Sequence, residues 1–293
     1  MATRRDFLKL GAGLAAGVVC STNIANGAES ISRKGGPVLK VGCAAYSYKK
    51  YLTAKENPIT LEDFLDTVAE IGCDGVEITS YYFPNPVTTS YLNRLKRKAF
   101  LLGLEITGMS VRNNFCVPPG DVREKEVSAV REWIRRASEL GAPCIRIFAG
   151  DPPKGTLSKD AARWVAECIE ACGDVAEKHG VMLALENHGA FTGNVENFLA
   201  IIKEVKTSWF GVNLDTGNFR GDDPYKDIEK AAPYAITTHV KTTVSPQKPA
   251  DYKMIANILK NVGYRGYLIL EYEAAEEPRI AVPEIVRAMK EAV

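Results

Sequence analysis

Four residues with metal-binding or acid–base side chains stand at the ends of apolar segments in the second half of the chain. Segments 181–186, 210–215, 235–239 and 267–271 end in Glu186, Asp215, His239 and Glu271, respectively. Short apolar segments between turn-forming residues are typical of buried parallel strands, whose carboxyl ends carry the chemistry of barrel and doubly wound enzymes. Three carboxylates and one imidazole would suit a single divalent cation such as Mn²⁺, Mg²⁺ or Co²⁺, and would tolerate Zn²⁺. The alternative is a set of unrelated polar residues at strand ends, but unpaired charges are seldom buried.

The segments that must position these residues alternate between strand and helix. We expect strands at 38–46, 75–79, 104–111, 144–149, 181–186, 210–214, 235–241 and 266–271. Helices are expected at 60–71, 90–102, 123–140, 158–179, from 194 onward, and at 224–231, 251–262 and 284–292. Eight such units in series predict an α/β fold, a single (β/α)₈ TIM barrel over residues 29–293. A dinucleotide-binding fold is disfavoured because no glycine-rich turn follows the first strand.

The motifs around the four strand ends resemble those of a known family. These motifs are Leu185-Glu186-Asn187-His188-Gly189, Leu214-Asp215-Thr216-Gly217-Asn218, His239-Val240-Lys241 and Leu270-Glu271. They are similar to motifs of the sugar phosphate isomerase/epimerase family of xylose-isomerase-like TIM barrels, and the resemblance extends over essentially all of residues 29–293. It implies one metal ion held by Glu186, Asp215, His239 and Glu271. It also implies that Glu186 and Glu271 are the catalytic acid/base pair that moves the substrate proton.

One position departs from the family pattern. Many relatives, among them DNA-repair endonucleases that hold three zinc ions with several histidines, carry histidine where this chain has Asn218. The chain has only three histidines, at positions 179, 188 and 239. A three-metal phosphodiesterase is therefore disfavoured, and Asn218 becomes a candidate for contact with a substrate.

Two further candidates follow from the geometry of strands. His188 and Lys241 lie two residues beyond Glu186 and His239, so each is expected on the same face as its ligand. Lys241 could bind a substrate hydroxyl or stabilise a developing oxyanion, or it could be a lysine in water at the rim. His188 could contact substrate or play a structural role.

Three more candidates lie on the first four predicted strands or directly after them. Arg146 and Glu77 could form a buried ion pair, or they could reach the substrate. Tyr46 could stack on a sugar face or pack in the core. These residues complete the set of expected substrate contacts.

The expected activity is that of a metal-dependent sugar isomerase or epimerase, which transfers a proton through a metal-stabilised enediolate. Epimerisation requires proton transfer on two faces of one carbon, whereas isomerisation requires one face. The loop after the last strand carries Glu271, Glu273, Glu276 and Glu277, and this acidic lip should repel phosphate. A non-phosphorylated sugar, keto-sugar or polyol is therefore expected. The alternatives are a lyase or dehydratase using the same proton abstraction, for example on 3-keto-glycosides, and a non-catalytic carbohydrate-binding protein.

The first 28 residues predict a twin-arginine export signal. Arg4 and Arg5 precede a weakly apolar segment, 10–19, that is too short to span a bilayer. After its removal we expect a protein in the periplasm or otherwise exported, without stable membrane insertion. Export by this route follows folding, so the metal would be acquired in the cytoplasm. There the supply of metal ions, rather than the affinity of the site, decides which ion is bound, and Mn²⁺ is the first choice.

Composition limits the partners and the redox chemistry. The chain has 37 Lys and Arg residues against 36 Asp and Glu, without basic runs, which gives no support for nucleic-acid binding. A small-molecule carbohydrate is the expected partner, and the sequence is compatible with a homo-oligomer. The six cysteines beyond the signal are expected as buried free thiols, because a chain of this length needs no disulfides.

Overall fold

The computed structural model describes residues 27–293, so the export signal predicted for residues 1–28 lies almost wholly outside the described part, and the boundary after residue 28 stays a prediction. Eight parallel strands close into a barrel in the order β1-β10-β7-β6-β5-β4-β3-β2. The strands are β1 (Val38–Ala44), β2 (Gly75–Thr79), β3 (Glu105–Ser110), β4 (Cys144–Phe148), β5 (Met182–Glu186), β6 (Phe210–Asp215), β7 (Ala235–Val240) and β10 (Arg265–Leu270). The closed barrel confirms the predicted (β/α)₈ architecture.

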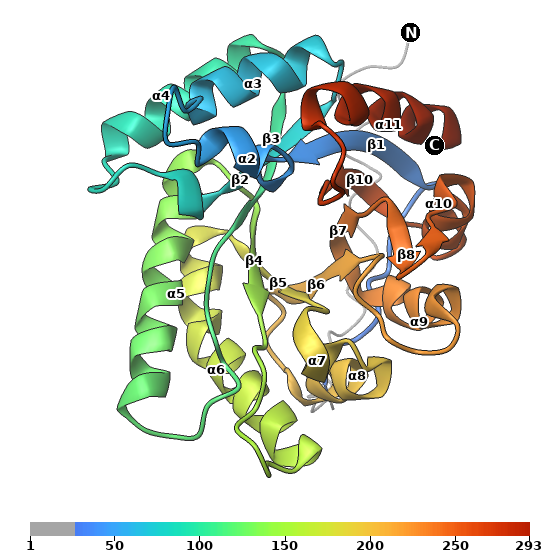
Figure 1. Cartoon of the computed structure of the whole chain (residues 1–293). Helices are drawn as coiled ribbons and strands as arrows, with labels where there is room; N and C mark the ends of the chain where they lie inside the picture. The colour runs from blue at the N-terminus through green and yellow to red at the C-terminus, as the bar shows by residue number, and fades with distance from the viewer. Residues whose placement is uncertain (1–26) are drawn as a thin grey trace, which may run out of the picture.

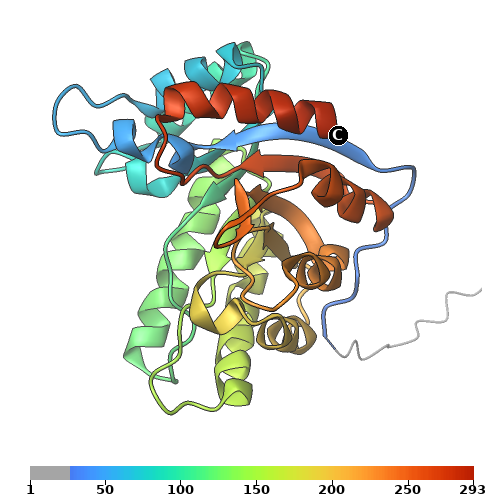
Figure 2. The same cartoon turned by 45° about the vertical axis from the view of Figure 1, so that its right-hand side comes forward.

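Eight main helices surround the barrel (Figure 1). They are α3 (Leu61–Glu70), α4 (Thr89–Leu101), α5 (Asp121–Leu140), α6 (Ser158–His179), α8 (Val195–Glu204), α9 (Pro224–Ala231), α10 (Tyr252–Asn261) and α11 (Pro278–Ala292). The last helix, α11, lies alongside β1, so the two ends of the barrel sequence meet where the sheet closes (Figures 1 and 2).

Local signals in the sequence determine where several helices begin and end. Thr60 precedes α3 and accepts a hydrogen bond from the Asp63 amide, while the Asp63 carboxylate accepts one from the Thr60 amide, so the two residues form a capping box. Helix α6 ends at Gly180, whose φ of 66° is the left-handed conformation that glycine adopts readily.

Helix α11 begins earlier than the sequence predicts. The predicted start is residue 284, directly after Pro283, and proline disfavours the interior of a helix. Instead, Glu277 caps the helix by accepting a hydrogen bond from the Arg279 amide, and Pro278 occupies the first helical position, which suits proline. Pro283 then lies inside the helix.

The structure contains several short elements that the sequence did not predict. They are α2 (Lys49–Leu52), α7 (Gly189–Thr192) and the antiparallel pair β8 (Thr243–Ser245) and β9 (Lys248–Pro249), with 3₁₀ turns at Ala45–Tyr48, Ser80–Tyr82 and Ala232–Tyr234. Each of these elements except the turn at Ala232–Tyr234 lies in a connection that follows a barrel strand, where barrel enzymes place substrate-binding loops.

The cysteines of the described chain are all buried and free, as predicted. They are Cys43, Cys73, Cys116, Cys144, Cys168 and Cys172. Within residues 27–293, no helix combines the length and the apolar character needed to cross a membrane.

Candidate metal and active site

The four predicted ligand residues converge at the carboxyl end of four neighbouring strands. Glu186 and Asp215 are the last residues of β5 and β6, His239 lies in β7, and Glu271 directly follows β10. Each is buried, and one ligand atom from each of the four lies within 4.8 Å of the others. This spacing brings three carboxylates and one imidazole close enough to share one cation.

The alignment of β5 and β6 is locked by Asn187. This fully buried side chain donates a hydrogen bond to the Asp215 carbonyl at 2.9 Å and accepts one from the Asp215 amide at 2.8 Å. In addition, Asp215 pairs in register with His239 on β7. The ligands of three strands are thus held at one level of the barrel.

Two of the four ligand residues carry buried atoms without a hydrogen-bond partner within the described chain, namely Asp215 Oδ2 and His239 Nδ1. An unsatisfied buried polar atom costs about 1–3 kcal/mol, so such atoms need an explanation. A divalent cation held by the four residues would give both atoms a partner. The residues present therefore fit a metal ion, and the oxygen-rich set agrees with Mn²⁺ or Mg²⁺ better than with a thiolate-seeking ion.

Glu186 is surrounded by donors. Its Oε2 lies 3.1 Å from Arg146 Nε and accepts a hydrogen bond from Asn213 at 3.1 Å. Its Oε1 lies 3.1 Å from His188 Nδ1 and accepts a hydrogen bond from Asn218 at 3.3 Å. Burial alone would raise the pKa of Glu186, but Arg146 and the contacts with His188 and His239 hold that pKa well below its usual range. The carboxylate is therefore ionised and available both to a cation and as a base.

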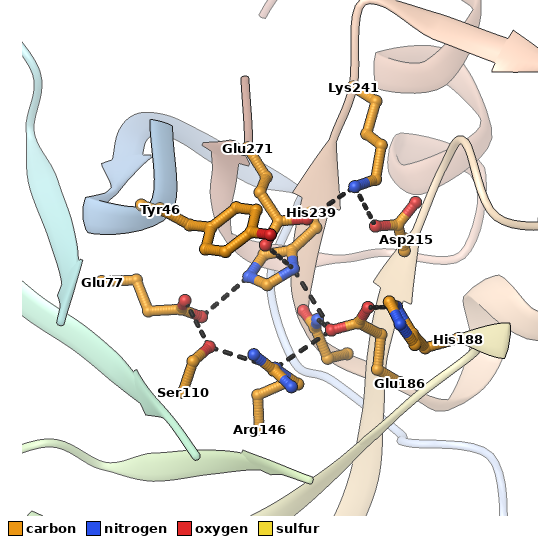
Figure 3. A network of polar contacts seen from close by, with 12 residues as sticks. Tyr46, Glu77, Ser110, Arg146, Glu186, His188, Asp215, His239, Lys241 and Glu271 are labelled. Carbon is orange, nitrogen blue, oxygen red and sulfur yellow. Dashed lines mark hydrogen bonds and ion pairs between the residues drawn. The ribbon is translucent and has the colours of Figure 1, made fainter. Parts of the chain in front are cut away.

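Glu271 is paired with a lysine, whereas Glu186 is paired with an arginine. Lys241 Nζ lies 2.7 Å from Glu271 Oε2 and 3.4 Å from Asp215 Oδ2, and it also contacts Glu273. Burial would raise the pKa of Glu271, but His239 and Lys241 together lower it. Burial raises the pKa of Asp215 to about 7 despite the opposing effect of Lys241. Figure 3 shows Glu186 and Glu271 on either side of the His239 ring.

A cleft of about 240 Å³ opens above these carboxylates. It is lined by Tyr46, Tyr81, Arg112, Arg146, Phe148, Glu186, His188, Glu271 and Glu273. Three of the six predicted substrate contacts, Tyr46, Arg146 and His188, are therefore in the lining.

The other three predicted contacts, Glu77, Asn218 and Lys241, do not line the cleft. Each instead contacts a member of the ligand set: Glu77 contacts His239, Asn218 contacts Glu186, and Lys241 contacts Glu271. Glu77 and Arg146 do not form a direct ion pair, since the hydroxyl of Ser110 bridges them.

Sequence reasoning did not identify several residues of the site. Tyr81, Arg112 and Phe148 line the cleft from connections or strand ends of the first half of the barrel, and no motif marks them. Glu273, by contrast, lies two residues beyond Glu271, and the period-two argument that selected His188 and Lys241 would have found it.

The acidic lip is less negative than the sequence suggests. Glu273 contacts Lys241 and lies 3.9 Å from Lys49, and Glu277 pairs with Lys50 at 2.6 Å. The two lysines at positions 49 and 50 come from the connection after β1, far from the lip in sequence. Repulsion of an anionic substrate by this loop is therefore weaker than expected.

Solved structures with a similar fold include sugar epimerases and a zinc-binding protein. D-psicose 3-epimerase from Clostridium cellulolyticum H10 is 20% identical, with 85% of this chain and 89% of that chain covered and a TM-score of 0.68. The 3-keto-D-glucoside 4-epimerase YcjR from E. coli is 15% identical, with 86% and 99% covered and a TM-score of 0.67. The IOLI protein with a bound zinc atom is 16% identical, with 86% and 96% covered and a TM-score of 0.69.

Sequence comparison with proteins of curated function finds no match. A family model, described as xylose isomerase-like TIM barrel, does match residues 65–292, which is more than half of the chain. The protein therefore belongs to the xylose isomerase-like TIM barrel family.

Proposed function

We propose that this protein is a metal-dependent sugar epimerase or isomerase that uses Glu186 and Glu271 as its acid/base pair. The observation that carries the proposal is a division within the ligand set. All four residues can share a cation, but only the two glutamates also line the cleft. Asp215 and His239 are fully buried behind it, so they can hold a cation but cannot reach a substrate carbon.

The reaction requires one proton to leave and one to return. One glutamate, as a carboxylate, removes the proton from the carbon next to a carbonyl group. The C–H electron pair forms a carbon–carbon double bond, and the π pair of the carbonyl group moves to its oxygen, which gives an enediolate. The other glutamate, which has taken up a proton from water, delivers it to the opposite face of the same carbon; the C=C electron pair forms the new C–H bond and the carbonyl group re-forms. The first glutamate returns its proton to water, so both carboxylates are regenerated. The product is the epimer, with no net change in atoms or oxidation state.

A divalent cation bound by the four residues would act as a Lewis acid that stabilises negative charge on the substrate oxygens. The protein's own residues would orient the two bases. Arg146 and His188 hold Glu186 from the cleft side, and Lys241 holds one oxygen of Glu271. Because both carboxylates are fixed, the substrate meets them in one geometry.

The substrate is proposed to be a non-phosphorylated sugar, keto-sugar or polyol. Barrels that bind phosphate commonly do so with the loops after the seventh and eighth strands. On that side the cleft is lined by Glu271 and Glu273, and no lysine or arginine of the described chain lines it there. Arg112, on the opposite side, stacks 5.0 Å above the ring centre of Tyr81 and can donate hydrogen bonds to sugar hydroxyls.

Two measurements test the proposal. Metal analysis of the purified protein should find about one divalent ion per chain, and chelation should abolish activity. Incubation with a panel of keto-sugars in heavy water should then give deuterium in the substrate together with inversion at the exchanged carbon. Release of a leaving group instead would indicate the lyase, and tight sugar binding without exchange would indicate a binding protein. Absence of stoichiometric metal would overturn the proposal.

The native ion and location belong to the same proposal. Mn²⁺ is expected because the folded export route lets the protein acquire its metal in the cytoplasm. Fractionation of cells that produce the chain with its own first 28 residues should recover the protein in the periplasm. Replacement of Arg4 and Arg5 by lysine should retain it in the cytoplasm.

A further inference from the structure

Glu77 lies on the far side of His239 from the ligand cluster. It belongs to β2, its side chain is only 2% exposed, and its Oε2 lies 2.9 Å from His239 Nε2. The other ring nitrogen, Nδ1, faces the carboxylates and lies 3.4 Å from Glu186 Oε2 and 3.5 Å from Glu271 Oε1. Glu77 is neither a member of the ligand cluster nor part of the cleft lining. The burial of this polar side chain therefore needs a different explanation.

A buried series of contacting side chains connects Glu77 to Glu186. Ser110 on β3 donates its hydroxyl hydrogen to Glu77 Oε1 at 2.6 Å, and Arg146 on β4 donates from Nε to Ser110 Oγ at 3.1 Å. Arg146 Nε also lies 3.1 Å from Glu186 Oε2. Since His239 contacts both Glu77 and Glu186, these five side chains form a closed ring across the barrel lumen (Figure 3).

Arginine sets the direction of the hydrogen bonds in this ring. A guanidinium can only donate, so Ser110 accepts from Arg146 and must use its own hydrogen to donate to Glu77. The Glu77 carboxylate then accepts on both sides, and the hydrogen of His239 is directed to Nε2. In neutral His239, the lone pair of Nδ1 is therefore left to face the site where a cation would bind.

We propose that Glu77 is a positioning residue that, with Ser110 and Arg146, fixes which nitrogen of His239 faces the ligand cluster and thereby sets the affinity of the site for its metal. This inference rests on the proposed function only in that the site binds a divalent cation. It is independent of the substrate and of the reaction.

An amide in place of the carboxylate makes the inference testable. The side chain introduced by Glu77→Gln would have one accepting and one donating end. If the oxygen faces His239, the Ser110 hydroxyl loses its acceptor. If the oxygen faces Ser110, the amide NH₂ donates to Nε2 of His239. The hydrogen of His239 must then lie on Nδ1, where it blocks coordination of the metal. Replacing Ser110 by alanine removes the reason for the second orientation.

Ser110→Ala should therefore change the affinity for Mn²⁺ in opposite directions in the wild-type and Glu77→Gln backgrounds. We expect Glu77→Gln to weaken Mn²⁺ binding about 10- to 100-fold, the range found for partners of ligand histidines. Ser110→Ala should weaken binding in the wild-type background, because Glu77 loses its donor. The same change should strengthen binding in the Glu77→Gln background. A general loss of stability would not reverse sign in this way.

The measurement is calorimetric titration of chelator-treated protein with Mn²⁺, with the absorption spectrum of the Co²⁺ form as a second readout of coordination. Glu105→Gln is the matched control, because Glu105 is a carboxylate at the opposite end of the barrel that bonds Tyr267 and Lys40. It should leave Mn²⁺ affinity unchanged.

The outcomes separate the two proposals. A wild-type protein that binds no metal overturns the proposed function. A wild-type protein that binds Mn²⁺ while Glu77→Gln binds it equally well overturns the positioning role, as does the absence of a sign reversal on adding Ser110→Ala. Should Glu77→Gln fail to fold, Ser110→Ala alone decides: affinity equal to that of the Glu105→Gln control overturns the inference.

Discussion

Lys241 Nζ lies 2.7 Å from Oε2 of Glu271 and holds one oxygen of a carboxylate whose other oxygen faces His239. The lysine side chain is largely buried and also lies 3.4 Å from Asp215 Oδ2. Two of the four candidate ligands, Glu271 and Asp215, therefore share the ammonium group of Lys241, which does not itself line the cleft. This arrangement links the stability of the barrel to the affinity of the site for metal.

Replacement of Lys241 by methionine should change these two quantities in opposite directions. Without the ammonium, Glu271 and Asp215 lose a counter-charge, and metal-depleted protein should be destabilised by about 3 kcal/mol, as for other broken buried pairs. The remaining negative charge should bind a divalent cation about tenfold more tightly or better. Chemical denaturation of the chelator-treated protein and calorimetric titration with Mn²⁺ measure the two effects. Lys241→Arg, which keeps the charge, is the control, and a loss of metal affinity in Lys241→Met would contradict the prediction.

The two glutamates of the cleft should each be indispensable for proton transfer. Glu186→Gln and Glu271→Gln should each lower deuterium exchange into the substrate by a factor of about 10² to 10⁴, as expected for loss of a general acid or base. Glu273→Gln is the matched control, because Glu273 lines the same cleft but does not belong to the ligand cluster. Exchange by Glu186→Gln or Glu271→Gln at the rate of this control would remove that glutamate from the mechanism.

Metal binding should become tighter as pH rises. Burial raises the pKa of Asp215 to about 7, so part of the population carries a proton there at neutral pH. For His239, burial lowers the pKa, but the carboxylates of Glu77 and Glu271 outweigh burial and raise it well above its usual value. Both residues must lose a proton to bind a cation, so a proton is released on binding.

Calorimetry in buffers of different ionisation enthalpy counts the released protons. We expect at least one proton per Mn²⁺ below pH 7, and an apparent affinity that increases from pH 6 to pH 8. An affinity that is independent of pH over this range would mean that neither residue binds the metal.

The cysteines should be unreactive in the folded protein. Burial raises the pKa of Cys43, Cys144 and Cys172 to about 12, and only the thiolate reacts with thiol reagents. Ellman's reagent should therefore modify fewer than one of the six thiols of residues 29–293 under native conditions and all six after denaturation. Rapid modification without denaturant would show that a thiol is accessible.

The architecture and the positions of the four candidate ligands could be predicted because both are encoded locally. Each of β5, β6, β7 and β10 is a short apolar run with a candidate ligand at or next to its end, such as Glu186 and Asp215. The parallel topology then brings these residues together, since the carboxyl ends of neighbouring strands lie at the same end of the barrel. The positions of the four candidate ligands could therefore be predicted without knowledge of side-chain packing.

The partners of these ligands could not be predicted in the same way. The sequence indicates that Glu77 and Arg146 lie on or near strands, but which side chains meet across the lumen depends on the stagger of the strands. A register shift between Val76 and Glu77 in the pairing of β2 with β3 is invisible in the sequence, and Glu77 comes to lie beside His239 rather than beside Arg146. Likewise, the pairing of Glu273 with Lys49 and of Glu277 with Lys50 depends on the conformation of the connections after β1 and β10.

All four candidate ligands lie on β5, β6, β7 or directly after β10, whereas Glu77, Ser110 and Arg146 lie on β2, β3 and β4. The barrel is thus divided into a half that would carry the ion and a half that would buttress it. Most of the cleft wall beyond the two glutamates, including Tyr46, Tyr81 and Arg112, also comes from the buttressing half. Exchanging the connections after β1, β2 and β3 is therefore a route to altered sugar selectivity that leaves every candidate ligand in place.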